Sequence, residues 1–469
     1  MKYLNKDFKV PNWVSCHTYF FGKENSRTYI SNEKKHTYVL LDGLASDMWK
    51  LIESDSENIE QWAKSKGVYE QVEGFLYDLS EQGLVLFNDG TNKAKEYEYE
   101  SINEKDESNA ETSFIEEMQN WLFDNGFMFS LFFELTYRCN LKCVHCYNPK
   151  NTPNVELDYE LCKKAIDDAY DAGCFKVAFS GGESTLHTKF YEIVQYARKK
   201  RMSVEIFTNG QLIANNESLY NKILKLYPYR ICVSLYSTDK EMHEKVTDVK
   251  GSFDKTFDLI KKLRNDNVNV QIKNFLLNFN CMDCIKVKDF AKKIKATSLA
   301  DISLIPTIEG DKKTIQYALN EDELFNLYIN PESPLFLHED FKPKNYEKIK
   351  DCSPCFGGFS GVCVNPNGNV VICVSLPYSV GNINYESIKD IWQNAVNKNP
   401  ESKLYQWQKV TISDLKDCYK NDYCSFCNYC PGMGYLENGY LKKSDVLCLQ
   451  AKTKMRAYNY LKNKKKNGC

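Results

Sequence analysis

The chain has 469 residues, which is more than one ordinary hydrophobic core supports, so we expect two or three domains. Its composition, with 43% hydrophobic and 26% charged residues, is typical of a soluble globular protein. The formal net charge of -2 gives no overall basic field that would attract nucleic acid or an anionic membrane, and we expect neither as a partner.

The start of the chain and its hydrophobic runs predict a cytoplasmic protein. Residues 1–13 carry charged side chains and no continuous apolar core, unlike a signal peptide. The longest apolar run, near residues 127–135, is too short to cross a bilayer. Because the cytosol keeps thiols reduced, the 19 cysteines indicate metal binding or redox chemistry rather than a disulfide framework.

Residues 1–95 predict a small domain in which strands precede helices. Short strands are expected at 28–30 and 37–41, on either side of a polar turn. Apolar residues at helical spacing predict three helices, at 43–53, 59–66 and 69–82. This order is that of a winged-helix-like domain.

This domain resembles the peptide-recognition element related to the small chaperone protein of pyrroloquinoline quinone biosynthesis. The similarity lies in Val39-Leu-Leu-Asp-Gly43 followed by Trp49, and in Leu79-Ser-Glu-Gln-Gly-Leu84. It implies that an edge strand binds a leader peptide, main chain to main chain. The alternative is an ordinary helical domain in which Trp49 and Leu79 are only core residues.

Residues 96–125 predict a linker and a bridging helix. The acidic stretch 97–111 has the composition of a flexible connector. A short helix is expected at 113–123, with Ile115, Met118 and Leu122 on one face.

Residues 126–340 alternate between predicted strands and helices, which indicates an α/β fold with a parallel sheet. The expected strands are 129–135, 176–180, 204–208, 231–236, 268–276 and 302–305. The expected helices include 160–172, 189–199, 253–264 and 282–296. A partial (β/α)6 barrel of the TIM type closes this pattern most simply, with reactive loops at the carboxyl ends of its strands.

Three cysteines follow the first of these strands in the spacing C-x3-C-x2-C: Cys139, Cys143 and Cys146. Three thiolates can hold three irons of a four-iron cluster and leave the fourth iron open. Zinc sites also use closely set cysteines. The loop, with Tyr147 directly after it, resembles the signature of the radical S-adenosylmethionine (SAM) superfamily.

Further polar residues stand at the ends of the next strands: Ser180-Gly181-Gly182-Glu183, then Thr208-Asn209-Gly210, then Ser234. Each alone is an ordinary turn or strand residue, but glycines permit close approach and a carboxylate could receive an amino group. The resemblance implies that Gly181, Gly182 and Glu183 meet the methionine amine of SAM. It also implies that Ser234 meets the ribose or carboxylate, and it makes Thr208 and Asn209 cofactor-binding residues. A reduced cluster would cleave SAM to a 5'-deoxyadenosyl radical.

Residues 341–469 contain a second cysteine set and little regular periodicity, so we expect metal rather than a large core to stabilise them. The turn Asn367-Gly368 should fold two short strands together. The set consists of Cys352, Cys355, Cys363, Cys373, Cys418, Cys424, Cys427, Cys430 and Cys448. It resembles the SPASM extension of radical SAM enzymes, which implies two auxiliary four-iron clusters and three [4Fe-4S] clusters in all.

The ligand partition within this set departs from the usual pattern. The run from Cys418 to Cys430 reads C-x5-C-x2-C-x2-C, whereas the family's usual run is C-x2-C-x5-C-x3-C. We predict one cluster on Cys355, Cys373 and Cys430 with Cys352 or Cys363. The other cluster is predicted on Cys418, Cys424, Cys427 and Cys448. Two zinc ribbons are the alternative for the set as a whole.

The three-part order resembles that of radical SAM maturases of ribosomally synthesised peptides. It implies capture of a precursor peptide by its leader and radical crosslinking of a core residue, with a Cys thioether as the predicted bond. An electron donor such as a flavodoxin or ferredoxin is implied as a second partner. The alternatives are carbon–carbon crosslinking, a protein maturase of the sulfatase-maturing type, and a zinc-stabilised peptide-binding module without turnover.

Overall fold

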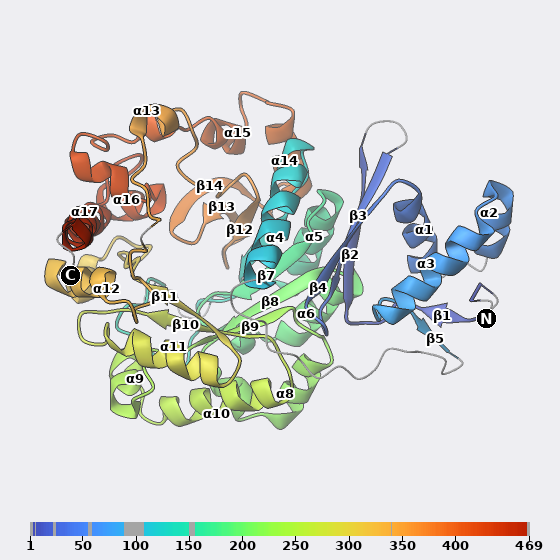
Figure 1. Cartoon of the computed structure of the whole chain (residues 1–469), viewed down its shortest axis with the longest axis horizontal. Helices are drawn as coiled ribbons and strands as arrows, with labels where there is room; N and C mark the ends of the chain where they lie inside the picture. The colour runs from blue at the N-terminus through green and yellow to red at the C-terminus, as the bar shows by residue number, and fades with distance from the viewer. Residues whose placement is uncertain are drawn as a thin grey trace.

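The computed structural model of the chain is shown in Figure 1. The structure describes residues 3–4, 6–21, 25–54, 59–88, 107–149, 155–338 and 340–466, with side chains for all of these except 107–112 and 465–466. None of the helices in these ranges combines the length and the apolar character that crossing a membrane requires.

The amino-terminal part is a three-stranded antiparallel sheet in the order β2-β3-β4, followed by three helices. Its strands are β2 (Val14–Phe21), β3 (Asn25–Asn32) and β4 (Thr37–Asp42), while β1 (Phe8–Lys9) pairs with β5 (Leu86–Phe87). Its helices are α1 (Leu44–Glu53), α2 (Ile59–Lys66) and α3 (Tyr69–Glu81), as predicted to within a residue. The sequence analysis missed β2, because Ser15, His17 and Thr18 break the apolar pattern of that strand.

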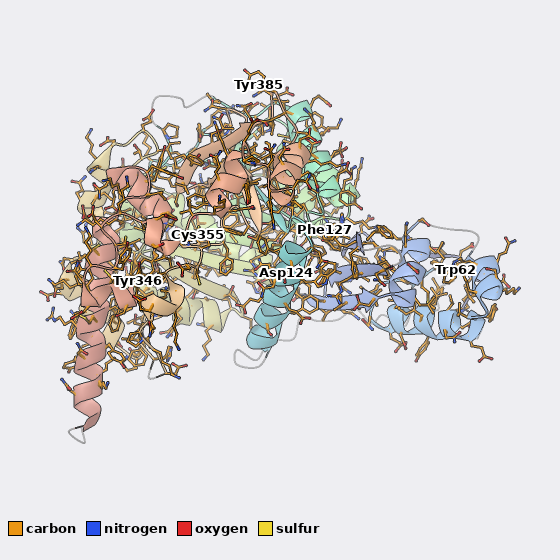
Figure 2. All side chains as sticks on the ribbon, turned by 90° about the horizontal axis from the view of Figure 1, so that it is seen from above. Trp62, Asp124, Phe127, Tyr346, Cys355 and Tyr385 are labelled. Atoms are coloured by element: carbon orange, nitrogen blue, oxygen red, sulfur yellow. The ribbon has the colours of Figure 1, made fainter. Side chains whose placement is uncertain are left out.

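The small sheet is packed on both faces. One face meets the domain's own helices, where Trp49 is fully buried and Leu79 nearly so. On the other face Tyr19 and Tyr29 pack against α4 (Glu107–Asp124) and against Phe129 and Phe175 at the base of the barrel. Figure 2 shows α4, with Asp124 at its end, between the amino-terminal sheet and the rest of the molecule.

The bridging helix is longer than the sequence analysis predicted. It begins at Glu107, so residues 107–111 are helical, and their assignment to a flexible connector was wrong. The rest of the predicted connector, 97–106, lies outside the described residues. Met118 and Leu122 are buried as predicted for this helix.

Six parallel strands form the predicted partial barrel, in the order β11-β10-β9-β8-β7-β6. They are β6 (Ser130–Glu134), β7 (Lys176–Ser180), β8 (Ser203–Thr208), β9 (Arg230–Ser234), β10 (Val270–Phe275) and β11 (Thr297–Asp301). The helices in this part are α5 (Tyr159–Asp171), α6 (Phe190–Lys199), α7 (Gln211–Ala214), α8 (Glu217–Leu224), α9 (Lys240–Thr247), α10 (Ser252–Asn265), α11 (Asp283–Lys293) and α12 (Glu321–Ile329).

The prediction of the sixth strand at 302–305 was wrong. The strand is β11, which ends at Asp301, and it is only partly buried because it lies at the edge of the sheet. The apolar residues Leu304 and Ile305, which suggested a strand, are instead buried in the loop that follows.

The carboxyl-terminal part continues the barrel sheet. Its strand β12 (Gly361–Val364) pairs in parallel with β6, and β13 (Asn369–Cys373) and β14 (Leu376–Asn382) follow antiparallel, giving nine strands. The predicted turn is present, with the Gly368 N–H donating to the Asn365 carbonyl over 2.9 Å. The helices are α13 (Tyr346–Ile349), α14 (Ile388–Val396), α15 (Lys403–Gln408), α16 (Pro431–Asn438) and α17 (Asp445–Lys466).

The expectation that metal replaces a core throughout this part was wrong for β12–β14, α14 and α15. Val364, Trp392 and Trp407 are buried and belong to the same hydrophobic core as the barrel strands. Figure 1 shows α12 and α17 at the opposite end of the molecule from α1, α2 and α3.

Candidate active site

The loop after β6, residues 135–148, which we call the cluster loop, carries Cys139, Cys143 and Cys146. Lys142 and Val144 donate their N–H groups to the carbonyls of Thr247 and Val246, both over 3.0 Å. At the end of the loop, the buried Tyr147 hydroxyl donates to Glu134 Oε1 over 2.9 Å. The loop is therefore held by backbone and buried polar contacts of the barrel itself.

The thiols of the cluster loop suit a cationic iron cluster. Burial raises the pKa of Cys139 to about 12, and burial followed by the neighbouring Cys146 and Cys139 raises that of Cys143. Thiols in such surroundings ionise readily only beside a cation, and iron supplies that charge. Asn209 Nδ2 lies 3.7 Å from Cys139 Sγ, and the Tyr236 hydroxyl lies 3.9 Å from Cys143 Sγ.

The cysteines of the cluster loop are not spaced for a single metal ion. In the part of the chain that the structure describes, no three His, Cys, Asp or Glu side chains gather closely enough to hold one metal ion. A four-iron cluster places each thiolate on a different iron, so its ligands stand farther apart than those of a single ion.

Gly181 and Gly182 bring the loop after β7 against the cluster loop. The Gly182 N–H donates to the Thr136 carbonyl over 2.7 Å, and the Glu183 N–H donates to the Arg138 carbonyl over 2.8 Å. Gly181 has φ +126°, and a Cβ on it would lie 2.4 Å from the Thr136 oxygen. A Cβ on Gly182 would lie 2.3 Å from the Arg138 oxygen. The close approach that these glycines permit is therefore to the cluster loop, whatever ligand they also meet.

Glu183 joins two strand ends. Its buried carboxylate accepts hydrogen bonds from the Thr208 hydroxyl over 2.7 Å and from the Asn209 N–H over 2.6 Å. It also accepts from the Thr185 hydroxyl over 2.6 Å, and burial raises its pKa while these bonds oppose the rise. Its predicted contact with the amine of SAM stays a prediction, because Glu183 is not among the residues that line the adjacent cavity.

A cavity of about 320 Å³, which we call the strand-end cavity, opens at the carboxyl ends of the barrel strands. It brings together eight of the predicted residues: Cys139, Cys143, Cys146, Gly181, Gly182, Thr208, Asn209 and Ser234. The rule that parallel strands carry their chemistry at their carboxyl ends therefore predicted most of its lining.

Several residues of the strand-end cavity were missed by sequence reasoning. Lys273, Asn274 and Asp301 line it from the ends of β10 and β11. The first two stand at the end of a correctly predicted strand and could have been found, whereas the misplaced sixth strand concealed Asp301. Asn274 Oδ1, His145 Nδ1 and Asn148 Oδ1 are buried without a hydrogen-bond partner. Because buried polar atoms are normally paired, these atoms fit a polar ligand such as SAM.

The second cysteine set forms two groups. Burial raises the pKa of Cys373 to about 12, with further contributions from Cys430 and Cys355, so these three thiols lie close together. Cys352 is exposed, whereas Cys363 is buried in β12 opposite Phe132 of β6. In the other group, burial raises the pKa of Cys418 to about 12, with further contributions from the three remaining cysteines: Cys427, Cys448 and Cys424.

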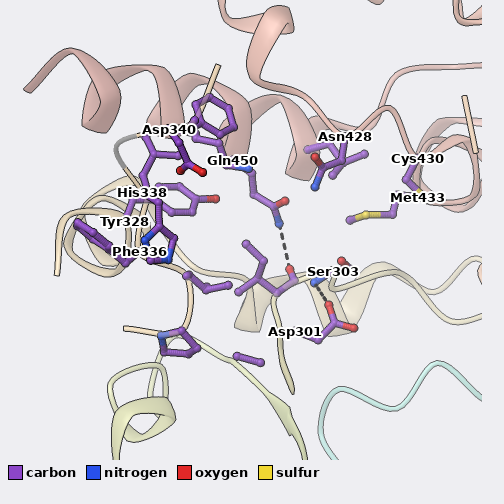
Figure 3. Close-up of a pocket in the computed structure, with 18 residues that line it drawn as sticks. Asp301, Ser303, Tyr328, Phe336, His338, Asp340, Asn428, Cys430, Met433 and Gln450 are labelled. Carbon is purple, nitrogen blue, oxygen red and sulfur yellow. Dashed lines mark hydrogen bonds between the residues drawn. The ribbon is translucent and has the colours of Figure 1, made fainter. Parts of the chain in front are cut away.

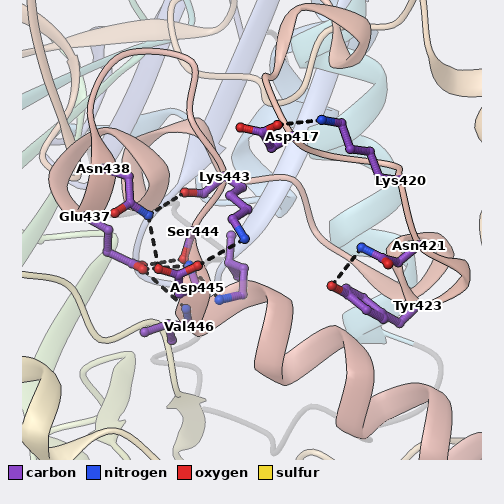
Figure 4. A network of polar contacts seen from close by, with 11 residues as sticks. Asp417, Lys420, Asn421, Tyr423, Glu437, Asn438, Lys443, Ser444, Asp445 and Val446 are labelled. Carbon is purple, nitrogen blue, oxygen red and sulfur yellow. Dashed lines mark hydrogen bonds and ion pairs between the residues drawn. The ribbon is translucent and has the colours of Figure 1, made fainter.

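The second group is framed by polar contacts around the start of α17, which Figure 4 shows. Glu437 accepts a hydrogen bond from the Asp445 N–H over 2.7 Å, another from the Val446 N–H over 3.3 Å, and one from the Ser444 hydroxyl. These contacts fix the first turn of the helix that carries Cys448. On the other side, Lys420 and Asp417 form an exposed ion pair of 2.6 Å next to Cys418.

A parallel partial barrel whose first loop carries C-x3-C-x2-C and whose second carries Gly-Gly-Glu defines a radical SAM enzyme. Comparisons with known proteins agree with this class. Residues 133–281 match the model of the radical SAM superfamily, and residues 355–431 match that of SPASM, an iron–sulfur cluster-binding domain.

Similar proteins extend the match over most of the chain. Antilisterial bacteriocin subtilosin biosynthesis protein AlbA of Bacillus subtilis is 31% identical over 335 residues, which cover 68% of this chain and 70% of AlbA. AdoMet-dependent heme synthase of Methanosarcina barkeri is 24% identical over 339 residues, 67% of this chain and 95% of the synthase. The chain belongs to the radical SAM superfamily, in the group with a SPASM domain, and is an enzyme that uses SAM and iron–sulfur clusters.

Solved structures share the fold. The crystal structure of Streptococcus suis SuiB bound to precursor peptide SuiA has a TM-score of 0.53 and 15% identity, and the match covers 94% of this chain and 99% of SuiB. The two chains therefore share their fold over 94% of this chain.

Proposed function

We propose that this enzyme is a maturase that crosslinks a ribosomally synthesised precursor peptide. The observation that carries the proposal is the relationship to AlbA, a bacteriocin biosynthesis protein, over two thirds of both chains. The fold shared with SuiB, which was crystallised with a precursor peptide, supports it. We further propose that the crosslink is a thioether from a Cys sulfur to carbon.

In this proposal the cluster loop and the strand-end cavity form the radical site. Cys139, Cys143 and Cys146 would hold the SAM-binding cluster. The lining residues Gly181, Gly182, Thr208, Asn209 and Ser234 would border SAM, whose polar groups would pair with unpartnered buried atoms such as Asn274 Oδ1. When bound, SAM and the cluster supply the hydrogen-abstracting radical, while the protein positions substrate and excludes water.

We propose two auxiliary clusters, which makes three clusters in all. Cys355, Cys373 and Cys430 would hold one, and we choose the exposed Cys352 as the fourth ligand. The thiol of Cys363 lies within the barrel sheet, where burial and then the neighbouring Glu134 raise its pKa. Cys418, Cys424, Cys427 and Cys448 would hold the other cluster, and a flavodoxin or ferredoxin would supply electrons.

We propose that residues 1–95 bind the leader, with β4 as the docking strand. Both β2 and β4 are outer strands of the small sheet. The backbone N–H of Cys16, on β2, donates to the Arg201 carbonyl over 2.9 Å, so the barrel occupies part of that edge. An outer strand can accept an extended peptide through its main chain, which favours β4.

The experiment is anaerobic co-expression with candidate precursor peptides, taken from any short Cys-containing open reading frames beside the gene, followed by mass spectrometry. A thioether should appear as the loss of two hydrogens with one cysteine that no longer reacts with an alkylating agent. Loss of two hydrogens with every cysteine still alkylable would refute the thioether proposal and indicate a carbon–carbon crosslink. A peptide of unchanged mass, from an enzyme that cleaves SAM, would refute the maturase proposal.

A further inference from the structure

A second cavity, of about 620 Å³, lies beside the open edge of the barrel. We call it the lateral cavity. It is bounded by the end of β11, by the segment with residues 334–338 and 340–341, and by α16 and α17. Because β11 is the outermost parallel strand, this side of the barrel is closed by the segment and the helices rather than by a further strand.

The lateral cavity adjoins the strand-end cavity. Asp301 and Ser303, at the end of β11, line both of them. Figure 3 shows these two residues below Gln450, with Cys430 and Met433 on one side and Phe336, Tyr328 and His338 on the other. A molecule in the lateral cavity would therefore reach the radical site past Asp301 and Ser303.

The first auxiliary group of cysteines borders both cavities. Cys430 lines the lateral cavity, while Val374 and Ser375, directly after Cys373, line the strand-end cavity. The two loops are packed closely, since a Cβ on Gly432 would lie 2.6 Å from the Ser375 oxygen. A substrate lying across the two cavities would thus pass beside this group.

The walls of the lateral cavity suit a peptide better than a purely apolar ligand. Leu335, Phe336 and Leu337 provide an apolar wall, and Met433 and Leu447 add further apolar side chains to the lining. Asp340, Lys454 and Gln450, whose amide donates to the Ile302 carbonyl over 3.0 Å, add polar side chains to the lining. The volume falls within the range of roughly 300–1,000 Å³ that ligand pockets usually have.

We propose that the lateral cavity binds the stretch of the core peptide that flanks the modified residue, with an apolar side chain against Phe336. Asp301 and Ser303 then form the threshold across which the modified side chain enters the strand-end cavity. This inference rests on the proposed maturase function and adds to it the place and chemistry of core-peptide binding.

Photo-crosslinking tests the location directly. The photoreactive residue p-benzoyl-L-phenylalanine is incorporated in place of His338, which lines the lateral cavity, or in place of Tyr385, which is 89% exposed in the turn between β14 and α14. After irradiation with the candidate precursor peptides of the co-expression experiment, we expect an adduct on the core segment only from position 338. No adduct from 338, or equal yields from both positions, would overturn the proposal.

A substitution tests the energetic contribution of the apolar wall. Phe336→Ala should raise KM for the peptide about tenfold or more, as loss of a buried aromatic anchor does. Peptide-independent formation of 5'-deoxyadenosine should stay as in the wild type, because Phe336 does not line the strand-end cavity. Tyr385→Ala is the matched control and should change neither quantity.

The two assays separate this inference from the proposed function. A position-338 adduct on a peptide that is never modified would refute the maturase and leave the cavity assignment standing. Modified peptide with no adduct, and with an unchanged KM in Phe336→Ala, would refute the cavity assignment and leave the maturase standing.

Discussion

The cluster loop and the second auxiliary group of cysteines, which consists of Cys418, Cys424, Cys427 and Cys448, are positioned by different means. The cluster loop is held by backbone hydrogen bonds to α9 and by the glycine contacts of the loop after β7. The carboxyl-terminal group stands on short turns and helix ends, stabilised by side-chain contacts such as the exposed Asp417–Lys420 pair. Exposed ion pairs contribute little. We infer that the barrel builds the first site by itself, whereas the second depends more on its metal.

The largest contrast should come from removing one cysteine of each site. Cys139→Ser should abolish SAM cleavage, because one of the three thiolates that would hold the SAM-binding cluster is lost. Cys448→Ser should keep peptide-independent SAM cleavage while losing about four irons per chain. Iron analysis and 5'-deoxyadenosine formation measure both effects, with Cys162→Ala, in the buried helix α5, as the control. SAM cleavage that persists in Cys139→Ser would contradict the assignment of the radical site.

A methyl group in the loop after β7 should be nearly as damaging. Gly182→Ala places a Cβ 2.3 Å from the Arg138 oxygen and 2.6 Å from the Tyr137 oxygen, so the cluster loop must move. A displacement of that kind can reduce turnover about 100-fold. The control is Gly74→Ala in α3, where a Cβ meets nothing within 4 Å. If SAM cleavage by Gly182→Ala matched the control, the backbone contact would not be what positions the loop.

Sequence reasoning worked best where burial and periodicity agree. The strand at residues 176–180 and the helix at 59–66 match in both bounds, because the apolar residues of each are buried in the core of its own part of the molecule. The edge strand β11 was misplaced because edge strands are half-exposed and lack a continuous apolar run. For the same reason, the position of Asp301 in the lining of the strand-end cavity was not predicted.

The functional site was predictable to the extent that it lies in local motifs. The cysteine spacing and the Gly-Gly pair were visible in single loops, and the structure places them together. The pairing of β12 with β6 and the lateral cavity could not be predicted, because each joins segments more than 100 residues apart without a motif. The predicted grouping of Cys355, Cys373 and Cys430 agrees with the structure, in which these three thiols are neighbours; only the choice between Cys352 and Cys363 needed the fold.

Glu134 should make the support of the cluster loop sensitive to pH. Burial raises the pKa of this carboxyl from 4.5 to about 7, although the Tyr147 hydroxyl donates to it. A carboxyl with a higher pKa in the folded than in the unfolded state binds its proton more tightly when folded. The folded state should therefore lose stability as pH rises from about 4.5 to about 7, and remain level above that range.

Glu134→Gln removes that titration. As pH rises from about 4.5 to about 7, the free energy of unfolding of the variant should increase relative to that of the wild type, by up to about 3 kcal/mol. Urea unfolding at several pH values measures the difference, with Glu192→Gln on the exposed side of α6 as the control. If the free energy of unfolding of the wild type and that of Glu134→Gln change in parallel from pH 4.5 to 7, Glu134 does not bind its proton more tightly in the folded protein.

The smallest effect should come from the polar contacts at the second site. Glu437→Gln weakens an acceptor of the Asp445 and Val446 N–H groups, so the first turn of α17 should lose about 1 kcal/mol. Because Cys448 stands on that helix, we expect faster loss of iron to a chelator, with SAM cleavage unchanged. Asn438→Ala is a matched control, since it removes neighbouring contacts to the Lys443 carbonyl, of 3.0 Å, and to the Asp445 carboxylate, of 3.3 Å, but leaves the helix N–H groups paired. Equal iron loss from both variants would mean that the metal, rather than this contact, fixes the start of α17. The side chains around the second site would then contribute as little to its geometry as the exposed ion pair does.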